Sequence, residues 1–270
     1  MKTFRSKLAG IDCLISEPDI ADVKTIVCLH GIGGDDASFA PQSEHLARRY
    51  RIVVWNMPGY RESDRIANLS FEALADSLAQ LLDTLDVGPV HLIGQSIGGM
   101  IAQEMYHRYP DKVESLILVA TTTTFGGRDD TFKNAFISAR LKPLESGMTM
   151  QQMAETAMPS IVGSKTEQHL ITSAINSMAA LDPDVYRQIL DCLVTFDRRR
   201  EWAGISCPVC LVAGTEDSNS PAATMKKMAD KLPNASYHEI EGAGHLVNLE
   251  QGRIFNSIVD SFIQSLVSPD

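Results

Sequence analysis

The segment VHLIGQSIGG (residues 90–99) decides how this chain folds. Val90–Ile93 is apolar enough for a buried strand, and Met100–Tyr109 follows as a helix that Pro110 ends. A Gly-x-Ser-x-Gly pattern at such a strand-to-helix turn holds the serine on a strained backbone. Its glycines avoid collisions there, and the hydroxyl projects from the sheet. The segment therefore predicts an α/β protein in which Ser96 is a nucleophile.

Apolar runs on both sides of this turn alternate with helical patterns, which is typical of a mostly parallel sheet with helices on both faces. Each run is apolar enough for a strand covered on both faces, and the runs are Thr25–Leu29, Ile52–Trp55, Leu116–Ala120, Val209–Ala213 and Ser236–Ile240. Near the start of the chain, Thr3–Lys7 and Ile11–Ser16 flank Ala9-Gly10. They predict an antiparallel hairpin at one edge of the sheet.

Capping residues mark the ends of several predicted helices. Ser70 is the expected N-cap of a helix that ends before Gly88-Pro89. Ser220 is the expected cap of another helix, which has Pro221 in its first turn and runs to Leu232. The last helix carries one apolar stripe, formed by Phe255, Ile258, Val259, Phe262, Ile263 and Leu266.

Between about Phe125 and Arg200 the alternation stops, and only helical patterns remain. One stripe contains Leu170, Ile171, Ala174, Ile175 and Met178, and Asp182-Pro183 starts a further helix. We therefore expect a core formed by residues 1–124 and 201–270, and an inserted helical lid formed by residues 125–200. Methionines at 148, 150, 153, 158 and 178 suit the roof of an adaptable pocket as well as the filling of a small helical core.

Composition limits the partners of the protein. A chain of 270 residues suffices for one large α/β domain with an insertion. The formal net charge of −10 argues against nucleic acid and membrane surfaces, so a small-molecule partner is expected. The N-terminal residues 1–7 precede no apolar h-region, and runs such as 116–120 are too short to span a bilayer. A cytoplasmic protein is expected, and the sequence is compatible with a homo-oligomer.

The cysteines predict neither disulfides nor a metal site. The chain has five cysteines, an odd number without framework spacing, so reduced thiols are expected. Cys207-Pro208-Val209-Cys210 has redox spacing, but it lies in an apolar stretch rather than at the start of a helix. A structural role for this pair is therefore favoured.

Backbone N–H groups are predicted to hold the oxyanion of a tetrahedral intermediate. The N–H of Ile97 lies at a helix N-terminus, where the dipole favours negative charge. A second donor should come from the loop HGIGG (residues 30–34) after an earlier strand, and Ile32 is the expected residue. His30 is expected to hydrogen-bond this loop rather than to act in catalysis.

The general base should follow the last strand, because the hydrolase triad runs serine, acid, histidine along the chain. Only His245, in the loop GAGHL (242–246), meets this requirement; the other histidines are His30, His45, His91, His107, His169 and His238. The acid is Asp217 or its neighbour Glu216, both in GTED (214–217). Asp217 is favoured because it lies at the far side of the turn, where it can orient the imidazole.

These motifs resemble the α/β-hydrolase superfamily over nearly the whole chain: HGIGG (30–34), NMPGYRES (56–63), GQSIGG (94–99), GTED (214–217) and GAGHLVNLEQ (242–251). TFGG (124–127) and FDRR (196–199) resemble the 3-oxoadipate enol-lactonase group. The resemblance implies an α/β-hydrolase fold, with a sheet of about eight strands, a helical lid and a Ser-Asp-His triad. Two residues depart from the usual pattern, since Asn56 replaces an acid and Arg61 replaces a glycine. Because this loop lies near the pocket, the departures bear on the substrate.

The expected activity is hydrolysis of a small carboxylic ester or lactone through an acyl-enzyme, with neither metal nor cofactor. If the substrate is an acid, an arginine under the lid should bind its carboxylate; the candidates are Arg128, Arg140 and Arg198. Two alternatives stay open. One is hydrolysis of a carbon–carbon bond in a ring-fission product, and the other is a non-hydrolytic ligand sensor on the same fold.

Overall fold

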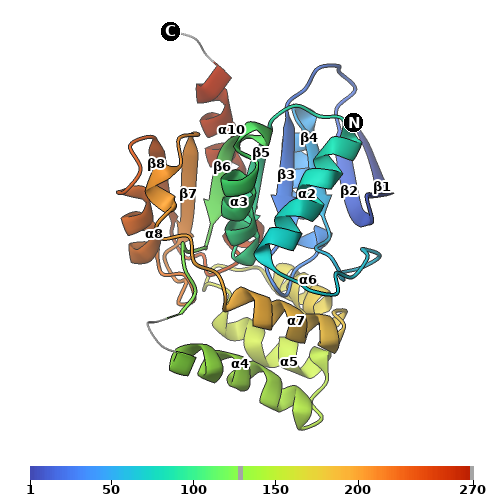
Figure 1. Ribbon diagram of the computed structural model, residues 1–270, viewed down its shortest axis with the longest axis vertical. Helices are drawn as coiled ribbons and strands as arrows, with labels where there is room; N and C mark the ends of the chain where they lie inside the picture. Colours follow the sequence, from blue (N-terminus) through green and yellow to red (C-terminus); the bar gives the residue numbers. More distant parts are fainter. Residues whose placement is uncertain (127–129, 268–270) are drawn as a thin grey trace.

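Within residues 1–126 and 130–267, which the computed structural model describes, an eight-stranded sheet forms the centre of the molecule (Figure 1). Its strands are β1 (Lys2–Leu8), β2 (Ile11–Glu17), β3 (Thr25–Leu29), β4 (Arg51–Trp55), β5 (Val90–Gln95), β6 (Val113–Val119), β7 (Val209–Gly214) and β8 (Ala235–Ile240). The order is β1-β2-β4-β3-β5-β6-β7-β8. β2 pairs antiparallel with both β1 and β4, and the remaining neighbours pair in parallel, so the predicted hairpin edge and mostly parallel sheet are confirmed.

Alternate side chains of the strands enter two apolar cores on opposite faces of the sheet. Val27 and Leu29 of β3 enter one core, and Ile26 and Cys28 enter the other, as the period of two along a strand requires. The helices α2 (Phe71–Leu85), α3 (Ile97–Arg108) and α8 (Ala222–Ala229) contribute to the first core. The second contains residues of α10 (Gly252–Val267), while α1 (Ala40–His45) lies in contact with α10. Helices therefore cover both faces.

Most predicted strands are buried along their length, but β8 is not. The strands β3, β5 and β7 are buried at every residue, whereas β8 is partly exposed at every residue except Ile240. The expectation that Ser236–Ile240 is covered on both faces was therefore wrong. The reason is position, because β8 is the edge strand of the sheet and pairs only with β7.

Of the two predicted capping residues, Ser70 and Ser220, the structure confirms one. Ser70 caps α2, because its Oγ accepts a hydrogen bond from the N–H of Ala73. The expected cap at Ser220 was wrong: α8 begins at Ala222 after Pro221 and ends at Ala229, short of Leu232. The N–H of Ser220 donates instead to Asp217 Oδ1 at 3.0 Å, so this segment turns around the carboxylate before the helix starts.

Within the described residues, four α-helices lie between β6 and β7 in the sequence, and in space they gather beyond one end of the sheet (Figure 1). They are α4 (Asp130–Glu145), α5 (Met150–Ala157), α6 (Gln168–Ala179) and α7 (Pro183–Leu193). The segments that enter and leave this group pair with each other, since the N–H of Phe125 donates to the carbonyl of Phe196 at 2.9 Å. Among the described residues, no helix is long and apolar enough to cross a membrane.

Candidate active site

Ser96 lies at the turn between β5 and α3 in a strained backbone conformation, with φ 55° and ψ −120°. The surrounding structure holds it there, because its N–H donates to Val119 O at 2.9 Å and its carbonyl accepts from Thr121 Oγ1 at 2.7 Å. The neighbouring glycines are required. A Cβ on Gly98 would lie 2.0 Å from Leu29 O, and one on Gly94 would lie 2.4 Å from Gly98 O.

The loop of residues 30–34 passes directly beside this serine. A Cβ on Gly31 would lie 3.4 Å from Ser96 Cβ and 2.2 Å from Gln95 Oε1, so only glycine lets the loop approach so closely. Gln95 is buried, and its Nε2 donates to the carbonyl of His245 at 2.9 Å. One side chain therefore connects the serine turn to the histidine loop.

The side chain of His30 holds this loop in shape through two hydrogen bonds. Its Nε2 accepts the N–H of Met57 at 3.0 Å, so its Nδ1 carries the proton and donates to Gly31 O at 2.8 Å. Burial lowers the pKa of the His30 ring, although the bond to Gly31 raises it, and the ring therefore stays neutral at pH 7. The hydroxyl of Tyr60 donates to Ile32 O at 2.6 Å. The contacts of His30 and Tyr60 thus hold the loop that carries Ile32, the residue that was predicted to bind an oxyanion.

The predicted acid and base meet across the ends of neighbouring strands. His245 Nδ1 lies 2.8 Å from Asp217 Oδ2, and the Asp217 side chain is fully buried. The other oxygen, Oδ1, accepts the N–H groups of Asn219 and Ser220 at 2.8 and 3.0 Å. Burial raises the pKa of Asp217, but the bond from His245, its charge and these N–H groups together hold the pKa below its usual value. The carboxyl is thus ionised and bonded at both oxygens.

Glu216, the alternative acid, points elsewhere. Its carboxylate accepts the N–H and the hydroxyl of Ser164 at 2.6 and 2.7 Å. These hydrogen bonds lower the pKa of this exposed carboxyl. Of the two neighbouring acids, only Asp217 is therefore bonded to the histidine in the part of the chain that the structure describes.

The three candidate arginines have different surroundings. Arg128 lies outside the described residues. Arg198 pairs with the buried carboxylate of Glu104, with its Nε 2.6 Å from Oε2. Burial raises the pKa of Glu104, while the charge of Arg198 lowers it. The guanidinium of Arg198 is thus already paired with a carboxylate of the protein.

Arg140, on α4, has no carboxylate partner among residues 1–126 and 130–267. Its guanidinium carbon lies 3.4 Å from the centroid of the Phe136 ring, and its Nη1 donates to Phe136 O at 3.3 Å. The side chain is half-buried, and burial lowers the pKa of Arg140, although the Tyr186 phenol raises it. A half-buried cation without an anionic partner is energetically unfavourable.

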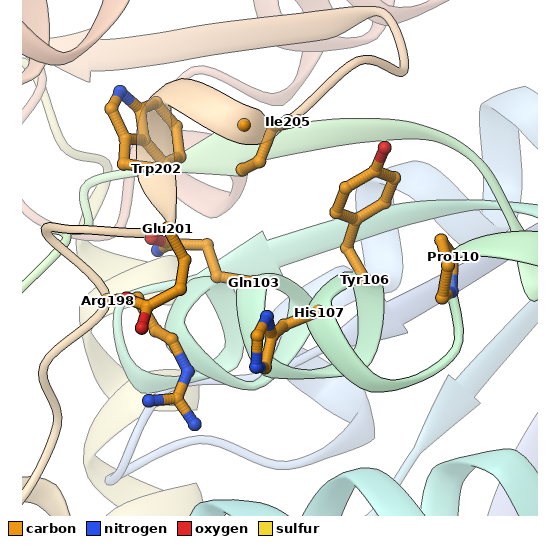
Figure 2. A pocket seen from close by; sticks show the side chains of 9 residues that line it. Gln103, Tyr106, His107, Pro110, Arg198, Glu201, Trp202 and Ile205 are labelled. Atoms are coloured by element: carbon orange, nitrogen blue, oxygen red, sulfur yellow. The ribbon is translucent and has the colours of Figure 1, made fainter.

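A pocket of about 400 Å³ lies beside the second half of α3, away from Ser96 at the start of that helix (Figure 2). Figure 2 shows Trp202 and Ile205 on one side and Tyr106 and His107 on the other. None of the triad candidates lines it; the lining residues are Gln103, Tyr106, His107, Pro110, Arg198, Glu201, Trp202, Gly204 and Ile205. This pocket is therefore separate from the candidate active site.

A family model described as alpha/beta hydrolase fold matches residues 24–138, the part that contains the serine turn. The crystal structure of the enol-lactonase from Burkholderia xenovorans superimposes with a TM-score of 0.86 at 21% identity, over 97% of this chain and 100% of that one. The chain has the α/β-hydrolase fold. The α/β-hydrolase fold predicted from the sequence motifs is thereby confirmed.

Proteins that are similar to this chain in sequence or structure carry esterase and related hydrolase names. A pimeloyl-[acyl-carrier protein] methyl ester esterase of Chromobacterium violaceum is 29% identical, over 82% of this chain and 86% of that protein. A putative carbamate hydrolase of Caulobacter is 25% identical, over 90% of this chain and 91% of that protein. An esterase from Thermogutta terrifontis superimposes with a TM-score of 0.84 at 21% identity, over 99% of this chain and 100% of that one.

Sequence reasoning missed the residues that support the histidine loop. Besides Gln95, the carbonyl of Ile161 accepts the N–H of His245 at 2.7 Å, and the buried carboxylate of Glu250 binds the loop on either side. Gln95 and Glu250 both lie inside motifs quoted above. However, a motif does not tell which backbone groups a long polar side chain reaches.

Proposed function

We propose that this protein is a serine hydrolase that cleaves a small carboxylic ester or lactone through an acyl-enzyme. The observation that supports this most is the hydrogen bond between His245 Nδ1 and the buried Asp217 carboxylate, in a fold that also presents Ser96 on a strained turn. A carboxylate in this position fixes the tautomer of the imidazole, so that Nε2 is free to accept a proton.

The reaction follows from these roles. His245 Nε2 takes the proton of Ser96 as Oγ attacks the carbonyl carbon of the substrate, and the N–H groups of Ile32 and Ile97 hold the oxyanion. The intermediate then collapses, and His245 gives its proton to the leaving alkoxide. In the second half, water attacks the acyl-enzyme with His245 again as the base, and His245 then returns the proton to Ser96 Oγ as the carboxylic acid product leaves. Asp217 stays ionised throughout and stabilises the imidazolium.

We also propose that residues 125–200 form a lid over a core of residues 1–124 and 201–270, and that the lid selects an acidic substrate. Arg140 supports this, because its half-buried guanidinium lacks a carboxylate partner in the described part of a chain whose net charge is −10. A substrate carboxylate would neutralise it with charge-assisted hydrogen bonds. Arg198 is not needed in this proposal, since Glu104 occupies it.

A fluorophosphonate probe tests the nucleophile. We expect the wild-type protein to be labelled at one site and Ser96→Ala to remain unlabelled, with intact mass spectrometry as the measurement. Absence of labelling in the wild type, or labelling of Ser96→Ala at the same rate, would contradict the proposal. The same variant should lose more than about a thousandfold in kcat on any true substrate.

A substrate panel then separates the reaction types. It contains p-nitrophenyl esters, lactones and enol-lactones with and without a free carboxylate, a carbamate, and a ring-fission diketone. Turnover of acidic esters or lactones is the expected outcome. Turnover of the diketone alone would favour carbon–carbon hydrolysis, and binding without any turnover would favour a ligand sensor.

A further inference from the structure

Glu250 is a buried carboxylate with no cationic partner in the part of the chain that the structure describes. It ends the short helix α9 (Val247–Glu250) and is 6% exposed. Its Oε1 accepts the N–H of Leu246 at 2.8 Å, and its Oε2 accepts the N–H of Gly244 at 3.0 Å. A buried carboxylate without such bonds would be costly. Two of its hydrogen bonds therefore go to residues that flank His245.

The same carboxylate also binds the segment of residues 161–166, which lies between α5 and α6. Oε2 accepts the N–H of Gly163 at 2.7 Å and the hydroxyl of Thr166 at 2.5 Å. Glu250 thus joins two stretches that are far apart in the sequence. One carries the proposed general base, and the other belongs to the proposed lid.

These two stretches are in contact through their backbones. The N–H of His245 donates to Ile161 O at 2.7 Å. A Cβ on Gly163 would lie 2.3 Å from Gly242 O, and one on Gly244 would lie 2.4 Å from Ile161 O. No side chain fits between them, so a shift of residues 161–166 must shift the histidine loop as well.

A second contact ties the same segment to the loop of the proposed acid. The N–H and hydroxyl of Ser164 donate to Glu216, which is adjacent to Asp217. The N–H of Glu216 in turn donates to Ala243 O, two residues before His245, at 2.9 Å. Residues 161–166 therefore contact both loops that carry the acid–base pair.

We propose that Glu250 is a positioning residue, which holds residues 161–166 against residues 242–246 and so makes the lid part of the scaffold that places His245. This inference rests on the proposed function, in which His245 is the base. A misplacement of about 1 Å in a reacting group can cost about a hundredfold in rate. Loss of Glu250 should therefore reduce the rate of the chemical step, although Glu250 itself touches no substrate.

Glu250→Gln is the main variant, because it keeps the size of the side chain and puts an NH₂ group where one acceptor oxygen was. Thr166→Val is the milder variant, which removes the hydroxyl that lies within hydrogen-bond distance of Glu250 Oε2 and of the carbonyl of Gly163. Gly163→Ala forces the two backbones apart while it leaves the Glu250 side chain itself unchanged. Arg65→Gln is the matched control, since it breaks a different contact to the lid, the ion pair with Asp182 at 2.6 Å.

The readouts are the rate of fluorophosphonate labelling of Ser96, and kcat and KM for p-nitrophenyl acetate, each beside thermal unfolding. For Glu250→Gln we expect labelling and kcat to fall at least about tenfold, with KM changed less than about threefold. Thr166→Val should lower kcat by about two- to tenfold, as loss of one hydrogen bond does. Arg65→Gln should behave as the wild type.

A double-mutant cycle separates positioning from general destabilisation. Adding Thr166→Val to Glu250→Gln should lower kcat no further, because Thr166 acts through Glu250. Wild-type labelling and kcat in Glu250→Gln, fully additive effects in the double variant, or an equal loss in Arg65→Gln would each overturn the inference. If Glu250→Gln does not fold, unchanged kcat in both Thr166→Val and Gly163→Ala would overturn it. Failure of the wild type itself to label would instead overturn the proposed function.

Discussion

Replacing Ser96 with glycine should stabilise the protein while it abolishes activity, because the serine backbone is strained. With φ 55° and ψ −120°, Ser96 occupies a region that suits glycine. Such strain costs about 1–3 kcal/mol. Glycine loses about 0.5–1 kcal/mol through the entropy of the unfolded chain. The difference leaves a net gain of about 1 kcal/mol, which corresponds to about 2–4 °C in Tm for a domain of this size.

Ser96→Ala is the matched control, since it removes the same hydroxyl but keeps the Cβ and hence the strain. Among the described residues the Ser96 hydroxyl makes no hydrogen bond, so its loss alone should change stability little. The assay is thermal and urea unfolding of the two variants side by side, with fluorophosphonate labelling absent from both. A glycine variant that is less stable than the alanine variant by about 0.5–1 kcal/mol, the ordinary cost of glycine, would refute the reasoning.

Three further outcomes are expected. Asp217→Asn should lower kcat by about 10⁴-fold, because it disturbs the imidazole tautomer. Glu216→Gln should lower kcat far less, because Glu216 bonds Ser164 and not His245. Steady-state kinetics of both variants on one ester measures the difference. The free energy of unfolding should fall as the pH drops below about 6.5, since burial lowers the pKa of His30 and the unfolded chain then binds more protons than the folded one. Urea titrations from pH 8 to 5 measure this fall. His30→Asn should make the free energy of unfolding depend less steeply on pH. Arg140→Met should reduce kcat/KM by about tenfold or more on an ester with a free carboxylate and little on its neutral analogue, so equal losses on both would argue against a carboxylate site.

The fold was predictable because its signals are local. The environment of the parallel strands can be predicted from each strand alone, since a strand covered on both faces must be apolar throughout. The glycines around Ser96 likewise indicate a tight turn without reference to distant residues. The error at β8 arose where the deciding property is not local. Ser236–Ile240 is apolar enough for a strand, but its position at the edge depends on which strands pair, and this is a long-range property.

The candidate site was predictable in its types of residue and less so in its contacts. His245 stood out by its place after the last strand, whereas Asp217 and Glu216 are neighbours in one turn. What separates them is the direction of each side chain: Asp217 meets His245, and Glu216 meets Ser164. Glu250 was missed because its partners at 163 and 166 come from a segment whose position only the folded chain reveals.

Asn56 and Arg61, the two departures from the usual loop pattern, both have partners within the protein. Asn56 is fully buried, with its Nδ2 donating to Asp12 Oδ2 at 2.7 Å and its Oδ1 accepting the N–H of Asp36 at 3.0 Å. Arg61 adopts φ 50° in place of a glycine and pairs with Asp35 at 2.5 Å. Both side chains are thus engaged by carboxylates or backbone of the core. Under the proposed function, we therefore expect substrate selection to depend on residues of the proposed lid such as Arg140, whose charge no described carboxylate neutralises, rather than on the loop of residues 56–63.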